Sequence, residues 1–211
     1  MALTLVTLDG SLVRMRQTRP IQACRIMEKF ARIVVGYHGC TRTFADGLLL
    51  GKIPIAEWSK SQNAYDWLGE GIYFWEHSPG RALRWATEQF HRRAAVIGTV
   101  IQLGVCFDLL DEDMTSLLAA SYQELEPYFG AAGKALPVNK GKDKKLRELD
   151  CAVINHCLNR MAQRRIPFDT VRGAFLEGPP VFPGTTISAE THIQIAVLNV
   201  DCILGVFRPN L

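Results

Sequence analysis

The sequence predicts an α+β protein of a single domain over residues 1–211. Strand-like runs rich in β-branched and aromatic residues lie near both ends of the chain, and segments with helical spacing fill the middle. The two kinds of segment do not alternate as they would in a βαβ protein, and no repeat or linker divides the chain. These observations favour sheets with flanking helices.

Composition and charge exclude several classes of function. Hydrophobic residues make up 48% and charged residues 21% of the chain, which is ordinary for a globular protein. The formal net charge of +3 is too small to indicate nucleic-acid binding by itself. No apolar run approaches the roughly 20 residues that cross a bilayer, and the first residues lack the pattern of a signal peptide. The six cysteines are scattered without zinc-ligand spacing, so we expect reduced thiols, no metal and a cytoplasmic protein without a membrane partner.

The first half of the chain is expected to hold two short strands that meet glycines. In order, we expect a turn at Asp9-Gly10, a helix over 21–32, a strand in IVVGYHG (33–39), a helix over 43–50 closed by Gly51, a connecting run at 53–58, a strand in LGEGIYFW (68–75) and a helix that starts at Ser78-Pro79 and ends near 91. A glycine beside a polar or aromatic side chain indicates a sharp turn or a close approach of the backbone to another group. We therefore expect the two strands to form the two sides of a small-molecule site.

The second half begins with a helical and basic insertion around 111–169. In order, we expect one strand or a bent pair over 96–110, a helix over 111–128, an exposed basic loop at 133–148, a helix over 149–161, a strand over 171–177 with the turn GPPVFPG, and two short strands broken near 199–201. The loop is rich in lysine and glycine, which is typical of a solvated surface.

Three polar side chains alternate along the strand that follows residue 189. Strand geometry places Glu190, His192 and Gln194 on one face. This face is either a solvated edge or the polar floor of a cleft. Similar alternatives hold elsewhere: Trp85 either completes an aromatic wall or packs in the core, and Tyr73 is either a ligand contact or a sheet aromatic.

YHGCTRTFADGLLLGKI, followed by WLGEGIYFWEHSPGRALRWA, resembles the ADP-ribosyltransferase superfamily, in particular the branch that contains the poly(ADP-ribose) polymerases and diphtheria toxin. Members of that branch carry a His-Gly strand, an apolar helix that ends in glycine, and then Gly-x-Gly-Ile-Tyr-Phe and a helix. The resemblance covers roughly residues 34–90 and, more loosely, 170–207. It implies a split, bent pair of β-sheets with flanking helices that holds NAD⁺ in a cleft, and NAD⁺ would be consumed as a substrate.

The resemblance also implies roles for individual residues. His38 would bond the adenosine-side ribose, and the backbone of Gly39 would bond the nicotinamide carboxamide. Tyr73, two positions after Gly71, would stack on the nicotinamide, and Gly71 would also contact NAD⁺. The third residue of the family, usually a glutamate, would bond the ribose beside nicotinamide. Gln194 takes that place if the apolar run after it is aligned, and Glu190 takes it if the residue type is kept.

Two departures from the family pattern bear on the expected chemistry. Cys40 replaces the usual hydroxyl beside His-Gly, so one bond to the carboxamide would be weaker. A glutamine at the third place keeps hydrogen bonding but loses the negative charge that stabilises an oxocarbenium-like transition state. If Gln194 is that residue, transfer of a single ADP-ribose is a better expectation than chain elongation.

Further residues are candidates for contacts at the edges of the site. Arg172 would pair with the diphosphate or lie on the surface, and Glu190 or Glu177 would deprotonate the acceptor. On the acceptor side we also place His192 and the loop lysines Lys142, Lys144 and Lys145, which form a solvated surface or contact an acidic protein or a nucleic acid.

The sequence thus predicts a mono-ADP-ribosyltransferase that moves ADP-ribose from NAD⁺ to a protein or nucleic-acid acceptor. Two alternatives stay open: an NAD⁺ glycohydrolase, with water as acceptor, and a non-catalytic module that binds NAD⁺ or ADP-ribose. The family further suggests an intracellular toxin or defence effector, and with it an inhibitor or antitoxin protein as a partner.

Overall fold

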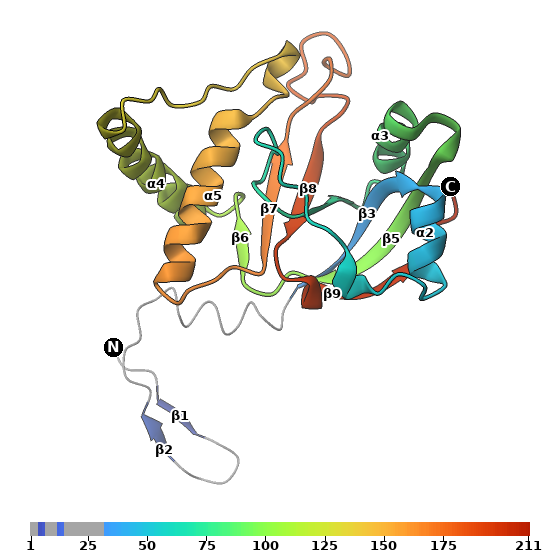
Figure 1. The fold of residues 1–211 in the computed structure, drawn as a ribbon, viewed down its shortest axis with the longest axis horizontal. Coiled ribbons are helices and arrows are strands. Elements are labelled where there is room, and N and C mark those ends of the chain that lie inside the picture. The colour runs from blue at the N-terminus through green and yellow to red at the C-terminus, as the bar shows by residue number, and fades with distance from the viewer. Residues whose placement is uncertain (1–3, 7–11, 15–31) are drawn as a thin grey trace.

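The computed structural model describes residues 4–6, 12–14 and 32–211, and these form an α+β protein, as the sequence predicts (Figure 1). A mixed sheet of seven strands forms the centre, in the order β6-β7-β8-β4-β3-β5-β9. Its strands are β3 (Ile33–Thr41), β4 (Ile72–Glu76), β5 (Ala94–Gln102), β6 (Cys106–Asp108), β7 (Thr170–Phe175), β8 (His192–Val197) and β9 (Ile203–Phe207). Hydrogen bonds join the seven strands in one sheet, whereas the resemblance implies a split pair.

Within the sheet only β6 and β7 run parallel, and the other neighbours are antiparallel. The run over 96–110 is the bent pair β5 and β6, and the final run is β8 and β9, as expected. Near the start of the chain, β1 (Thr4–Val6) pairs with β2 (Leu12–Arg14). The turn expected at Asp9-Gly10 and the helix expected over 21–32 lie outside the described residues.

Helices cover the two faces of the sheet. They are α2 (Arg42–Leu49), α3 (Pro79–Phe90), α4 (Glu112–Ala131) and α5 (Glu148–Gln163), with the short 3-10 helices η1 (Ile55–Glu57), η2 (His91–Arg93), η3 (Lys142–Lys144) and η4 (Val200–Cys202). The local signals in the sequence account for several ends. The Thr41 side chain caps α2 by accepting a bond from the Phe44 N–H, and Gly51 follows that helix at φ +67°. Pro79 opens α3.

Two hydrophobic cores lie on opposite faces of the sheet because alternate residues of a strand point to opposite sides. Phe74 and Ile195 belong to the core beneath α2 and η1. Ala196 belongs to the other core, which includes Ile154 of α5 and Val171 of β7, with Tyr73 packed against it. The segment over 111–169 therefore shares a core with the sheet.

Within the residues described, no helix combines the length and the apolar character that crossing a bilayer requires. The same part of the chain contains no group of three or more His, Cys, Asp and Glu side chains placed to hold a metal ion.

Candidate functional site

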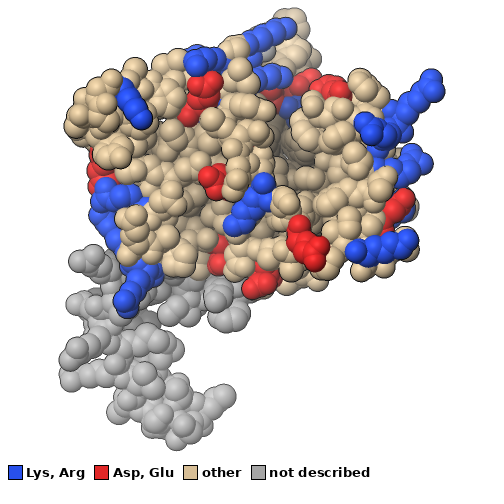
Figure 2. Space-filling view, viewed as in Figure 1, with Lys and Arg blue, Asp and Glu red and all other residues tan. Residues whose placement is uncertain are grey.

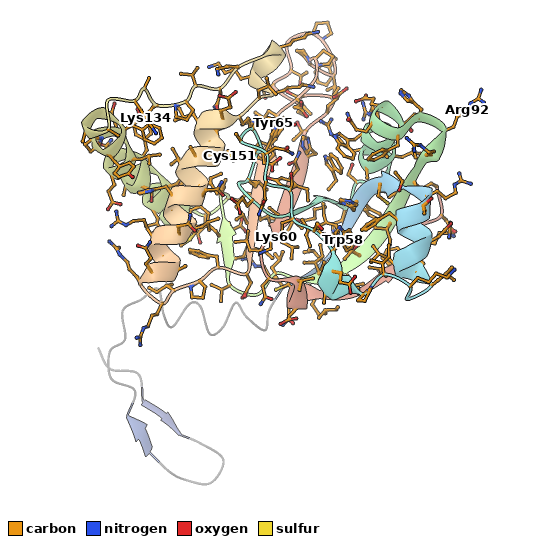
Figure 3. The ribbon with its side chains drawn as sticks, in the orientation of Figure 1. Trp58, Lys60, Tyr65, Arg92, Lys134 and Cys151 are labelled. Atoms are coloured by element: carbon orange, nitrogen blue, oxygen red, sulfur yellow. The ribbon has the colours of Figure 1, made fainter. Side chains whose placement is uncertain are left out.

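A cleft of about 940 Å³ opens beside the ends of β3 and β4, a volume that suits a bound small molecule. Its walls are the end of β3, most of β4, one side of α3, the segment over 58–67 and residues in β8 and next to it. Trp58, Lys60 and Tyr65 belong to that segment, which crosses the middle of the molecule (Figure 3). On the face seen in Figure 2, positive and negative side chains are interspersed, so that face carries no continuous basic surface.

The cleft exists because β3 and β4 stop pairing early. Their ladder pairs Gly36 with Glu76 and Tyr37 with Trp75, and ends there. The Val35 carbonyl accepts a hydrogen bond from the backbone N–H of His77, directly after β4. Backbone groups of a strand alternate in direction, so the N–H and C=O of Gly39 point to the same side, beyond the end of the ladder. Gly39 lines the cleft, and these backbone groups have no partner in the ladder between β3 and β4.

His38 lies at the point of divergence. Its Nδ1 is 2.8 Å from the Tyr73 carbonyl oxygen, and because a carbonyl accepts, Nδ1 carries the proton and Nε2 is left as an acceptor. The ring is surrounded by Phe44, Trp58 and Phe74, with centroids 5.0 to 6.4 Å away. Burial lowers the pKa of His38, partly offset by the bond to the carbonyl. The side chain therefore offers a neutral imidazole to the cleft.

An aromatic wall forms on the α3 side of the cleft. Trp85 is 38% exposed and lies 5.8 Å from Trp75, centroid to centroid, and both line the cleft. Gly39 lies directly beneath α3: a Cβ there would be 2.6 Å from the Ala82 carbonyl oxygen and 2.9 Å from the Trp85 ring. The glycine is thus required for packing of the helix as well as being open to the cleft.

Tyr73 is one of the residues that line the cleft, and its hydroxyl is bonded within the protein. The hydroxyl donates to the Gly69 carbonyl at 2.6 Å and accepts from the Leu68 N–H at 2.8 Å. Burial raises its pKa, so the hydroxyl stays protonated. We expected Gly69 and Gly71 to let the backbone approach a ligand, but close packing within the protein also explains why both are glycines. A Cβ at Gly69 would be 2.4 Å from Asn155, and one at Gly71 would be 2.9 Å from Ala196.

Cys40 lines the inner part of the cleft and is 4% exposed. Burial raises the pKa of its thiol to about 11. The thiol therefore stays protonated at neutral pH, where it is a weak hydrogen-bonding group and a poor nucleophile.

Both candidates for the third residue lie at the cleft. Gln194 is in β8, where it pairs with Trp75 of β4, and it is 8% exposed. Glu190 precedes β8 in a loop, and its side chain is 33% exposed. His192, expected on the same face, is 6% exposed and lies behind them, with its Nε2 3.0 Å from Nε2 of Gln194.

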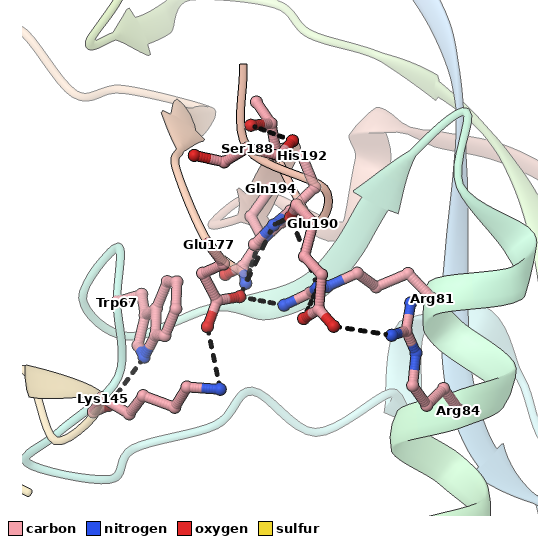
Figure 4. A network of polar contacts seen from close by, with 10 residues as sticks. Trp67, Arg81, Arg84, Lys145, Glu177, Ser188, Glu190, His192 and Gln194 are labelled. Carbon is pink, nitrogen blue, oxygen red and sulfur yellow. Dashed lines mark hydrogen bonds and ion pairs between the residues drawn. The ribbon is translucent and has the colours of Figure 1, made fainter. Parts of the chain in front are cut away.

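A network of ion pairs connects α3 with the segment between β7 and β8 (Figure 4). Arg81 pairs with Glu177 and, at 3.0 Å, with Glu190. Arg84 also bonds Glu190 at 3.0 Å, and Lys145 bonds Glu177 at 3.0 Å. The hydrogen bond from Arg81 is the main cause that lowers the pKa of Glu190, with further help from the charges around it. Glu190 is therefore held as an anion and is a weaker base than a free carboxylate.

The sequence did not single out Arg81 and Arg84 as site residues. They are three positions apart in α3 and so project from one side of the helix, which is a usable signal. Their partners lie 96 to 109 residues away and could not be identified from spacing.

Arg172 and two of the lysines lie away from the cleft. Arg172 is bound to Glu76 at 2.6 and 3.0 Å and to Asp108 at 3.2 Å. It does not line the cleft, so this arrangement gives no support to the expected pairing with a diphosphate. Lys142 and Lys144 are exposed in η3 and do not line the cleft. Of the three loop lysines named above, Lys145 lines the cleft.

No protein-family model, curated protein or solved structure matches the chain.

Proposed function

We propose that this protein is a mono-ADP-ribosyltransferase that consumes NAD⁺ and transfers one ADP-ribose to a macromolecular acceptor. The observation that carries the proposal is the cleft itself. His38, Gly39, Tyr73 and Gln194 come from three separate strands and all line it, in keeping with the roles that the resemblance implies for them.

Each proposed contact has a chemical basis in the geometry. The unprotonated Nε2 of His38 suits the hydroxyl of a ribose as donor. The Gly39 backbone presents a donor and an acceptor side by side, which matches a carboxamide. We place the nicotinamide against the rings of Tyr73 and Trp85, two of the residues that line the cleft.

The transfer requires little from the protein beyond positioning. The bond between the nicotinamide nitrogen and the ribose C1′ breaks, and its electron pair neutralises the positive ring as nicotinamide leaves. An oxygen or nitrogen of the acceptor gives a lone pair to C1′ and loses its proton to water or to a carboxylate such as Glu177. Because Gln194 has no charge, it would stabilise the positive ribose less than a glutamate does. This supports transfer of a single unit over elongation of a chain.

A binding module without turnover is the second candidate, and one observation favours it. The two carboxylates at the cleft, Glu177 and Glu190, are both engaged by arginine or lysine. A carboxylate so held is a poor general base. The module would gain thermal stability with NAD⁺ but release no nicotinamide.

The test is incubation of the purified protein with NAD⁺ labelled in the adenylate part, alone and then with protein, RNA or DNA as acceptor. Nicotinamide release is measured by chromatography and transfer by the label that stays on the macromolecule. We expect both signals, and we expect His38→Ala and Tyr73→Ala to lower them while the exposed His91→Ala does not. Nicotinamide with only free ADP-ribose would indicate a glycohydrolase. Stabilisation by NAD⁺ without nicotinamide would indicate the binding module, and the absence of all three signals would refute the proposal.

The third residue is tested by comparing Gln194→Ala with Glu190→Ala. We expect the first to lower nicotinamide release by about 10-fold or more, since loss of one transition-state contact costs a few kcal/mol. If only Glu190→Ala abolishes turnover, Glu190 holds the third place instead.

A further inference from the structure

A chain of hydrogen bonds runs along the start of β8 behind the cleft (Figure 4). Nδ1 of His192 is 3.0 Å from the carbonyl oxygen of Glu190, and its Nε2 is 3.0 Å from Nε2 of Gln194. His192 and Gln194 are 6% and 8% exposed, so their polar atoms depend on partners within the protein or on a ligand.

The partners decide where the protons lie. A carbonyl oxygen only accepts, so Nδ1 of His192 carries the proton that is donated to Glu190. In the neutral ring Nε2 is then an acceptor, and the Gln194 amide must turn its NH₂ group toward it. The other end of the amide is the carbonyl oxygen Oε1. Gln194 lines the cleft, so Oε1 is the amide atom left for a ligand.

We propose that His192 is a positioning residue that fixes the orientation of the Gln194 amide, so that Oε1 faces the cleft as an acceptor for a ligand hydroxyl. With NAD⁺ as the ligand, an assignment that rests on the proposed function, the hydroxyl belongs to the ribose beside nicotinamide. Without this bond the amide would present either its oxygen or its NH₂ group. The histidine thus gives a neutral glutamine the acceptor-only character that a carboxylate has at the same place.

The surroundings of His192 keep it neutral at physiological pH. Burial against the rings of Trp67 and Phe175 lowers its pKa. The charged and polar groups around it act in both directions: the Glu190 carbonyl and Glu177, whose Oε2 is 3.7 Å from Nδ1, raise the pKa, while Arg81 and Arg147 lower it. Lys145 and Arg84 pair with the two glutamates from the far side.

At lower pH the Gln194 amide should therefore turn around, so that its oxygen and its NH₂ group exchange places. When His192 is protonated, both of its ring nitrogens donate, and Gln194 must turn Oε1 toward the ring and its NH₂ group toward the cleft. A ligand hydroxyl then loses its acceptor. Ligand affinity is expected to fall as the pH drops through the pKa of His192.

The proton arrangement is tested first, by NMR of ¹⁵N-histidine-labelled protein without ligand. The His192 signals are assigned by their absence in His192→Gln. We expect the tautomer with the proton on Nδ1. In Gln194→Glu the ring nitrogen faces a carboxylate, so His192 should be doubly protonated at neutral pH. A proton on Nε2 in the wild type, or a neutral ring in Gln194→Glu, would overturn the proposal.

The consequence for binding is tested by a double-mutant cycle on the dissociation constant of NAD⁺. Loss of one oriented hydrogen bond corresponds to about 3- to 10-fold weaker binding. We expect His192→Phe to weaken NAD⁺ binding by that factor. The same change made in Gln194→Ala should weaken binding by less than about 2-fold further. His192→Gln should recover the affinity of the wild type, because the new amide can again accept a hydrogen bond from Gln194. The matched control, His156→Phe, changes a partly exposed histidine of α5 outside the cleft and should leave the constant unchanged. Circular dichroism confirms that each variant is folded.

Two outcomes separate this proposal from the proposed function. If NAD⁺ does not bind the wild type, the proposed function fails, while the tautomer and the Gln194→Glu titration still decide whether His192 sets the amide. If NAD⁺ binds but the effects of His192→Phe and Gln194→Ala are simply additive, or if the affinity of His192→Gln keeps the pH dependence of the wild type, the positioning role is refuted and the proposed function stands.

Discussion

Tyr73→Phe separates a structural role of Tyr73 from its proposed role at the nicotinamide. The change removes the hydroxyl that donates to Gly69 at 2.6 Å and accepts from Leu68 at 2.8 Å, but keeps the ring. Leu68 is fully buried, so its N–H is left without this partner, which costs about 1–3 kcal/mol. For a chain of this length each kcal/mol lowers Tm by about 2–4 °C. We therefore expect a loss of about 2 kcal/mol, or roughly 4–8 °C in Tm.

The assay is urea and thermal unfolding followed by circular dichroism, with Tyr128→Phe as the control. Tyr128 is 70% exposed, and its change should stay within about 0.5 kcal/mol. Because the ring remains, NAD⁺ should bind Tyr73→Phe within about 3-fold of the wild type, whereas Tyr73→Ala loses the stacking surface as well. Equal stability of Tyr73→Phe and the wild type would refute the structural reasoning. Equal NAD⁺ affinity of folded Tyr73→Ala would instead refute the stacking role.

Three other changes follow from the packing and the charges. Gly39→Ala should destabilise the protein by about 1–3 kcal/mol, because the added methyl group would collide with α3. Gly80 lies in α3 itself and has open space around it, so Gly80→Ala should be neutral or stabilising by up to about 1 kcal/mol. Urea unfolding compares the two variants. Arg172→Ala leaves the buried Glu76 carboxylate without its partner, while Asp108 keeps its ion pair with Arg32, and should cost about 3–5 kcal/mol. The exposed Arg208→Ala should cost at most about 1 kcal/mol, and equal losses would contradict the assignment of Arg172 to the interior. Stability should also fall as the pH drops below 6.5, because the unfolded chain binds protons that the buried His38 and His192 resist. The contribution of His192 to this slope is up to about 1.4 kcal/mol per pH unit until its folded pKa is reached, and urea unfolding of His192→Gln should show a slope that is shallower by that contribution.

The fold class and most elements could be predicted because their signals are local. Proline at the first turn of α3 and glycine after α2 mark helix ends within a few residues. Alternation of apolar residues identifies the strands. The number of sheets is a matter of hydrogen bonds between distant strands, and so the single seven-stranded sheet was not predictable in the same way.

At the candidate site, the sequence by itself determined which residue types stand at the ends of the strands: a histidine and a glycine in β3, a tyrosine in β4, and a polar face of His192 and Gln194 at the start of β8. Alternation alone would separate His38 from Gly39, since neighbours in a strand point to opposite faces. Both reach one cleft because β3 and β4 diverge after Tyr37.

Only the tertiary structure decided which partners these residues meet. Arg172 looked available for a ligand, but Glu76 and Asp108, which are 96 and 64 residues away, neutralise it in the interior. Glu177 and Glu190 looked free to act as bases, but Arg81 holds both. The physical reason is the same in each case: a charge or a polar group removed from water requires a partner, and the sheet brings that partner from a distant part of the chain.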